Sequence, residues 1–156
     1  MVIDNSIYNT KNGRSLHAWF ITGYSDGDSS FSIRLRSNLS GKLGFRVSIV
    51  YSIGAEINPE NRKLLEQVKK YFGGVGSISK CANMYVYEIA SIKAPLRGIV
   101  RKHFEEFPLQ TSKFVHFQLW CQVMDMIEKG EHLTMEGFLK ILAIKAVVLR
   151  TKRIIR

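Results

Sequence analysis

The stretch GYSDGDSSF, residues 23–31, contains two carboxylates and two glycines at the junction between two sequence patterns. A helix-like apolar run precedes it and a strand-like alternation follows it, so Asp26 and Asp28 are expected at the C-terminal end of a helix. Carboxylates in that position lie at the negative end of the helix dipole, which is unfavourable. A cation bound beside them would remove the cost. The stretch is therefore a candidate cation site.

The other metal-binding residue types do not form a recognisable pattern. Cys81 and Cys121 form no CxxC pair, and the four histidines form no HxxxH or HExxH motif. This argues against a structural zinc site and favours a reduced compartment with both thiols free. No apolar run is long enough to span a bilayer, and the first fifteen residues show neither a secretion nor a transit pattern. The protein is expected to work where it is made.

The net charge is the strongest compositional signal. Twenty-three Lys and Arg against thirteen Asp and Glu give +10 in a chain of 156 residues. A domain this basic is expected to bind a polyanion, and nucleic acid is the usual one. The alternative is a charged surface that only keeps the protein in solution.

The elements that must position the carboxylates begin with a helix over 16–27. Its apolar residues recur every four positions, while Gly23 and Gly27 share another face. Glycine is costly inside a helix, so two on one face indicate that another backbone approaches closely there. The alternative is a helix that ends at Gly23. The predicted contact face consists of Thr22, Gly23, Asp26 and Gly27.

Two hairpins follow from alternating patterns, one over 29–37 and 45–51 and one over 75–91 with its turn at Ala82–Asn83. Each is expected to bury one apolar face and to expose a polar one. A two-stranded ribbon with a basic face fits the major groove of DNA. The candidate DNA-binding residues are Ser30, Ser32, Arg34, Arg36, Arg46, Ser48, Ser77, Ser79, Lys80, Met84, Val86 and Glu88.

The remaining segments predict helices over 58–74, 95–107, 111–129 and 134–149, begun by Asn58, Pro95 and Thr134 and ended by glycine or proline. The order is αββαββαα, which is typical of an α+β fold with all helices on one face of an antiparallel sheet.

The segment ITGYSDGDS, residues 21–29, resembles the LAGLIDADG signature of homing endonucleases. Three later segments resemble the same family in the same order: FGGVGSI (72–78), HFEEFPLQTSK (103–113) and EKGEHLTMEG (128–137). The likeness covers about residues 16–147. It implies a saddle-shaped antiparallel sheet, a single LAGLIDADG domain over 16–150 with an extension at 1–15 and a basic tail at 151–156, and an origin in an intron of a mitochondrion or chloroplast.

The resemblance also implies a chemistry. The family hydrolyses double-stranded DNA at specific sites with Mg²⁺; Mn²⁺ can substitute, and Ca²⁺ supports binding without efficient cleavage. Asp28 matches the metal-binding acid, Asp26 the acid that caps and supports, and Lys113 a lysine near the scissile phosphate. The alternative for Lys113 is a solvated lysine at the start of a helix, without a catalytic role. Ser29 replaces the usual glycine. Arg46 stands where relatives usually have a glutamine that orders water beside the metal, so Arg46 is the third catalytic candidate, and its guanidinium is expected to bind phosphate there instead.

The chain contains one copy of the signature and no internal repeat. One copy supplies one metal carboxylate and half of a DNA-binding saddle. The expected assembly is a homodimer on a pseudo-palindromic target, or a pair with a second LAGLIDADG half. The alternative function is a weakly active or inactive DNA- or RNA-binding protein of the same fold, such as a maturase-like protein. Retention of Asp28 and Lys113 favours the endonuclease.

Overall fold

The computed structural model describes residues 16–90 and 96–154, with side chains to residue 151. The predicted extension over 1–15, the helix-opening Pro95 and the end of the basic tail lie outside these residues. The described elements follow the predicted order of a helix, two strands, a helix, two strands and then helices. The α+β prediction is confirmed.

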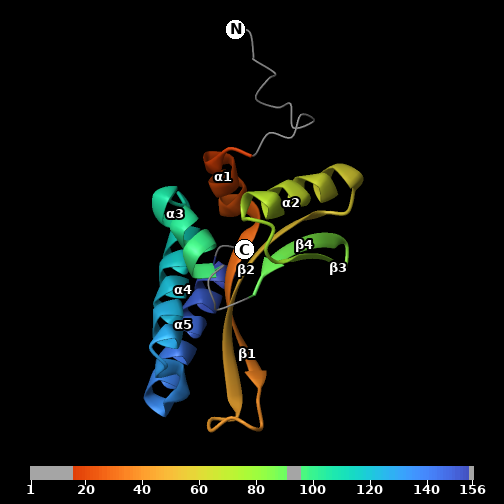
Figure 1. Ribbon diagram of the computed structural model, residues 1–156. Helices are drawn as coiled ribbons and strands as arrows, with labels where there is room; N and C mark the ends of the chain where they lie inside the picture. The colour runs from red at the N-terminus through yellow and green to blue at the C-terminus, as the bar shows by residue number, and fades with distance from the viewer. Residues whose placement is uncertain (1–15, 91–95, 155–156) are drawn as a thin grey trace, which may run out of the picture.

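The sheet has four strands, all antiparallel, in the order β1-β2-β4-β3. Its members are β1 (Ser29–Ser37), β2 (Phe45–Glu56), β3 (Ser77–Cys81) and β4 (Met84–Ile89). The first hairpin extends away from the end of the molecule where the first helix of the chain lies, and β4 of the second hairpin pairs with the part of β2 nearer to that end (Figure 1). Strand β2 continues past the predicted end at Tyr51 to Glu56, and this added length pairs with β4.

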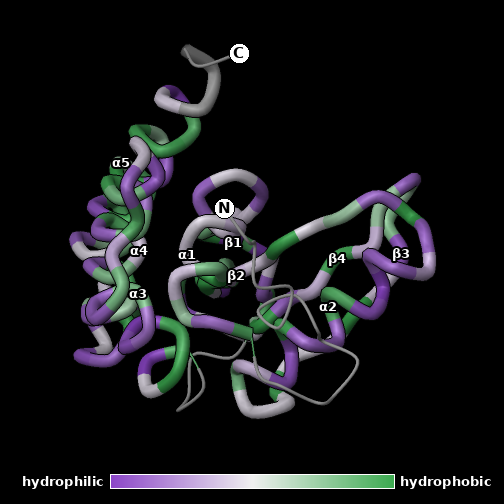
Figure 2. The backbone as a smooth tube through the Cα atoms, turned by 90° about the horizontal axis from the view of Figure 1, so that it is seen from above, coloured by the Kyte–Doolittle hydropathy of each residue, from purple (hydrophilic) through white to green (hydrophobic). Residues whose placement is uncertain are grey.

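The helices all lie on one side of the sheet. Helices α1 (Ala18–Asp28) and α2 (Pro59–Tyr71) lie at one end of this side, while α3 (Lys102–Glu106), α4 (Lys113–Glu128) and α5 (Met135–Ile154) run together beside the first hairpin (Figures 1 and 2). The Asn58 side chain accepts a hydrogen bond from the Asn61 amide, and Gly130 adopts φ 75° after α4. These are the predicted start and stop signals.

Two helical predictions need correction. The segment after Pro95 is a π-helix over Leu96–Arg101 before it becomes α3, because the backbone hydrogen bonds there reach one residue further than in an α-helix. Helix α5 continues beyond Leu149 to Ile154, so the beginning of the predicted basic tail is helical.

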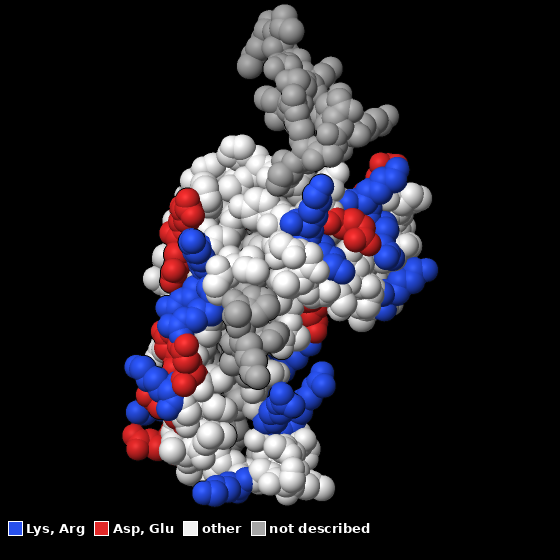
Figure 3. Space-filling model, viewed as in Figure 1, with Lys and Arg blue, Asp and Glu red and all other residues white. Residues whose placement is uncertain are grey.

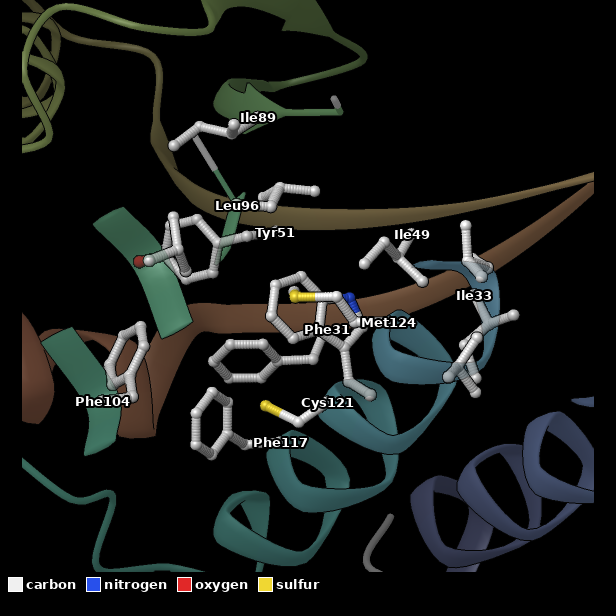
Figure 4. Close-up of a cluster of buried hydrophobic side chains, with 14 of the residues drawn as sticks. Phe31, Ile33, Ile49, Tyr51, Ile89, Leu96, Phe104, Phe117, Cys121 and Met124 are labelled. Atoms are coloured by element: carbon white, nitrogen blue, oxygen red, sulfur yellow. The ribbon is translucent and has the colours of Figure 1, made fainter. Parts of the chain in front are cut away.

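The core fills the space between the sheet and the helices. Phe31 of β1 is 1% exposed, and its ring centroid lies 5.3 Å from those of Phe104, Phe117 and Trp120. Figure 4 shows the aromatic rings beside Met124 and the β-branched residues of the strands. Removing a buried aromatic ring of this kind typically costs about 3–5 kcal/mol of folding free energy. The core therefore fixes α3 and α4 against the first hairpin.

No helix in the described ranges is long and apolar enough to cross a membrane.

Candidate nucleic-acid interface

The carboxylate of Asp28 lies at the junction between α1 and β1. Asp28 is the last residue of the helix and is exposed. The next residue, Ser29, donates both its amide and its hydroxyl to the carbonyl of Ser25, the latter over 2.7 Å. These two hydrogen bonds end the helix at Asp28, and the strand begins at Ser29 without the glycine that usually ends the signature.

Lys113 at the start of α4 lies at the same helix end. Its Nζ donates to the Ser25 carbonyl over 3.1 Å. An ammonium beside the last carbonyls of a helix interacts favourably with the helix dipole. This end of α1 therefore has a cation of the same chain beside its carbonyls, and it carries two of the three residues that the sequence singled out as catalytic candidates, Asp28 and Lys113.

Tyr24 is a neighbour of Asp28 that the sequence prediction missed. Its hydroxyl donates to the carbonyl of Gly54 on β2 over 2.9 Å. Partial burial, with a smaller contribution from the negative charge of Asp28, raises the pKa of Tyr24. The spacing of four residues between Tyr24 and Asp28 was a signal that these side chains share one face of the helix.

The Asp26 carboxylate, unlike that of Asp28, accepts hydrogen bonds from the segment before α4. Its Oδ2 accepts from the Gln110 amide over 2.9 Å, and its Oδ1 accepts from the Thr111 amide and hydroxyl over 3.1 and 2.7 Å. The carboxylate therefore ties α1 to the segment that begins α4. These hydrogen bonds agree with the role of Asp26 as an acid that supports the structure. They differ from the prediction that its side chain lies on the contact face of the helix with Gly23 and Gly27.

Thr22 was wrongly placed on the contact face. It is 1% exposed, and its hydroxyl donates to the carbonyl of Phe107 over 2.8 Å. The same oxygen lies 3.1 Å from Nε2 of His103, so it accepts from that nitrogen, and Tyr71 donates to Nδ1 over 2.9 Å. Burial lowers the pKa of His103 to about 4, which agrees with a neutral ring. Thr22 faces inward because this network joins α1 to the buried side.

The two glycines of α1 do face outward. A Cβ atom on Gly23 or Gly27 would meet nothing within 4 Å. Trp19 and Phe20 flank them and are 49% and 45% exposed. Packing within the described chain therefore does not require either glycine, and the two leave a flat apolar strip on the outside of the helix.

The open face of the sheet follows from the register. Ser30 is paired with Ser52, which is paired with Glu88, which is paired with Ser77, so this row crosses all four strands. The alternation places the following predicted residues on the same face: Ser30, Ser32, Arg34, Arg36, Arg46, Ser48, Ser77, Ser79, Met84, Val86 and Glu88. Lys80 is an exception, because it is paired with Tyr85 and shares the face of Tyr87, which the helices cover.

Arg46 cannot act at Asp28. Ser29 is paired with Ile53, and Arg36 is paired with Arg46 seven positions further along β1. At roughly 3.3 Å per residue this separation is about 23 Å. The β2 residues nearest to Asp28 are Ile53 and Gly54, so the prediction of a catalytic Arg46 is wrong.

The charges on the open face are unevenly distributed. Acidic and basic side chains alternate along the helical side of the molecule, whereas basic groups project near the first hairpin (Figure 3). Arg36 and Arg46 are exposed, and no described carboxylate pairs with them. Arg34, by contrast, forms an ion pair with Glu88, with both Nη atoms bonded to the two carboxylate oxygens over 2.7 and 2.6 Å.

A complete metal site is not assembled in the described part of the chain, where no three His, Cys, Asp or Glu residues gather. Mg²⁺ typically takes only one or two protein carboxylates and completes its shell with phosphate and water. The exposed Asp28 carboxylate fits one such ligand position.

Residues 21–124 match the family described as LAGLIDADG endonuclease. The chain belongs to the LAGLIDADG endonuclease family. It is 34% identical over 133 residues to the "Probable intron-encoded endonuclease 3" of Neurospora crassa, a match that covers 84% of this chain and 24% of the relative.

Two solved structures have the same fold. I-SmaMI bound to cleaved DNA is 33% identical, with a TM-score of 0.79 over 85% of this chain and 43% of that one. I-CpaMI bound to uncleaved DNA is 35% identical, with a TM-score of 0.76 over 85% of this chain and 43% of that one. The chain thus spans about a quarter of the curated LAGLIDADG relative and less than half of these two nucleases.

Proposed function

We propose that the chain is one half of a site-specific, metal-dependent endonuclease for double-stranded DNA. The observation that carries the proposal is that the Asp28 carboxylate and the Lys113 ammonium both lie at the end of α1, where the first strand of the open polar face begins. An exposed carboxylate and an ammonium at one helix end are the groups that metal-assisted phosphodiester hydrolysis needs from this side of a site.

The residues have distinct tasks in this proposal. Asp28 contributes one carboxylate ligand to Mg²⁺, which when bound would activate water and stabilise the leaving oxygen. Lys113, held by the Ser25 carbonyl, keeps a positive charge where negative charge grows on the scissile phosphate. The hydrogen bond from Tyr24 to the Gly54 carbonyl fixes β2 against α1, and so keeps the start of the first hairpin in place beside Asp28.

The second half of the site comes from another LAGLIDADG unit that packs on Gly23 and Gly27. Those glycines are open to a partner backbone and are flanked by exposed aromatic side chains. The two solved nucleases are more than twice as long as the matched segment, which supports the need for a second unit. A second copy of this chain is the simplest supply and implies a pseudo-palindromic target.

The relatives support a divalent-metal requirement and an intron origin for this chain. One I-SmaMI structure holds an uncleaved DNA target in the presence of calcium ions, which supports binding without cutting in Ca²⁺ for this chain as well. The Neurospora relative is described as intron-encoded. We extend this to an organellar intron, mitochondrial or chloroplast, as the source of the chain.

One experiment tests the function directly. The full chain is incubated with a randomised duplex library in Mg²⁺ and in Ca²⁺, and both the cut and the bound molecules are sequenced. A shared sequence among the cut ends in Mg²⁺, and among bound but intact duplexes in Ca²⁺, supports the endonuclease. Sequence-selective binding without cutting in Mg²⁺ would instead indicate a binding protein of the same fold.

A further inference from the structure

The ion pair between Arg34 and Glu88 joins two strands that are not neighbours. Arg34 lies on β1 and Glu88 on β4, with β2 between them. Nη1 donates to Oε1 over 2.7 Å and Nη2 donates to Oε2 over 2.6 Å. Such a bidentate pair orients the guanidinium plane as well as neutralising it.

The pair crosses β2 above Val50. Arg34 is paired with Ser48, and Glu88 is paired with Ser52, so Val50 lies between the two on the same face. Val50 is only 1% exposed although it belongs to the open face. Coverage by the ion pair accounts for this burial, and the Arg34 and Glu88 side chains keep 36% and 28% of their surface exposed.

The pair leaves donors available to DNA but little net charge. A guanidinium has five N–H donors, and the two bonds to Glu88 use one from each Nη. The Nε–H and the outer N–H of one Nη lie side by side on one edge of the guanidinium and stay unused by Glu88, and the Arg34 side chain keeps 36% of its surface exposed. Because the carboxylate cancels the charge, this edge gains little from phosphate and can still pair with acceptors on a base edge, as arginine does with guanine.

We infer that Arg34 and Glu88 act as one specificity element, in which Glu88 fixes Arg34 for reading a base and removes its attraction to phosphate. This rests on the proposed binding of DNA by the open face. Glu88 is then a positioning residue for Arg34, since each of its oxygens accepts a hydrogen bond from one guanidinium nitrogen. Sequence-independent affinity comes instead from exposed cations such as Arg36 and Arg46.

The test is selection of bound duplexes from a randomised library in Ca²⁺, followed by affinity measurements at several salt concentrations. The double variant Arg34→Gln/Glu88→Gln keeps the net charge and side chains of similar length. It should lose a preference of about tenfold at one or two base pairs, with an unchanged salt dependence and an affinity for random duplex within about twofold. Arg36→Ala, the matched control, should lower affinity for all duplexes and reduce the salt slope by about one unit.

The exchanged variant Arg34→Glu/Glu88→Arg guards against a purely structural role, because it can keep the ion pair over Val50. It should fold with a similar thermal midpoint and select a different base at the affected positions. If either variant selects the wild-type sequence at every position, the inference is overturned while DNA binding stands. If the wild-type chain itself selects no sequence, both this inference and the proposed site-specific function fail.

Discussion

The two ends of the open face differ in how their charged groups are held. At the α1 end, the Lys113 ammonium is bonded to a backbone carbonyl, and a hydrogen bond from Tyr24 ties that end to β2. At the far end of the first hairpin, Arg36 and Arg46 are exposed, and Leu39 in the turn is 94% exposed. One end is fixed by tertiary contacts, and the other is presented to solvent.

Under the proposed function, the two ends have different tasks. Chemistry on a phosphodiester requires groups held in place before the substrate arrives, because their positions determine the stabilisation of developing charge. Attraction of a polyanion requires only accessible charge, because phosphate contacts are sequence-independent and screened by salt. Changes at the α1 end should therefore alter rate, and changes at the hairpin tip should alter affinity.

The largest expected effect is at Asp28. Asp28→Asn should lower the cleavage rate of a proven target by about a hundredfold or more, because a neutral amide is a poor ligand for Mg²⁺. Affinity in Ca²⁺ should change by less than about threefold. Single-turnover cleavage and equilibrium binding measure the two quantities separately. Glu66→Gln, an exposed acid on α2, is the control and should leave both unchanged.

If Asp28→Asn cleaves the target in Mg²⁺ at nearly the wild-type rate, Asp28 is not a metal ligand, and the α1 end does not differ from the hairpin tip in the way proposed.

The next effect concerns the outer strip of α1. Gly23→Leu should abolish self-association at micromolar concentration while leaving the fold intact, because the new side chain projects away from its own chain. Gly23→Ala is a milder companion that should raise the helix stability by up to about 1 kcal/mol. Sedimentation velocity reports the oligomeric state, and urea unfolding reports the stability.

If the wild-type chain sediments as a strict monomer with and without DNA, the partner is a different LAGLIDADG half and not a second copy.

Changes at the hairpin tip should have smaller effects. Arg36→Ala and Arg46→Ala should each weaken binding to all duplexes by a similar factor and flatten the salt dependence by about one unit, because each removes one phosphate contact. The single-turnover rate at saturating protein should stay within about twofold. Filter binding over a range of salt concentrations measures the slope. A rate loss as large as that of Asp28→Asn would show that the tip shares in the chemistry.

The smallest expected effect at neutral pH is on folding stability and concerns His103. Its Nε2 donates a hydrogen bond to the Thr22 hydroxyl of α1. Its folded pKa of about 4 lies below its usual value near 6.5. The unfolded chain therefore binds more protons between these values, and stability should fall as the pH drops from about 6.5 towards 4. His103→Gln should reduce this pH dependence. Urea unfolding at pH 7, 5.5 and 4.5 measures it, and an unchanged slope in the variant would assign the acid sensitivity to other groups.

Much of the architecture was determined by local sequence. The alternation in SSFSIRLRS and FRVSIVY predicts two strands with one apolar face, and that face is buried in the structure except towards the hairpin tip, where Phe45 is 52% exposed. The start of α2 at Asn58–Pro59 and the end of α4 before Gly130 follow from capping and from the left-handed backbone that glycine adopts readily. These features depend on neighbours within a few residues, so the sequence is sufficient to predict them.

The site depended on contacts that no local pattern encodes. Alternation placed Arg46 on the open face, but only the strand register shows that it is seven pairs away from Ser29. Helical spacing grouped Thr22 with the glycines, but hydrogen bonds to Phe107 and His103, 81 or more residues away in the chain, turn it inward. The pairing of β4 with β2 brings Glu88 within reach of Arg34. The sequence thus determined which side chains alternate, and the tertiary structure decided which of them meet, because strand order, register and helix packing are set by residues far apart in the chain.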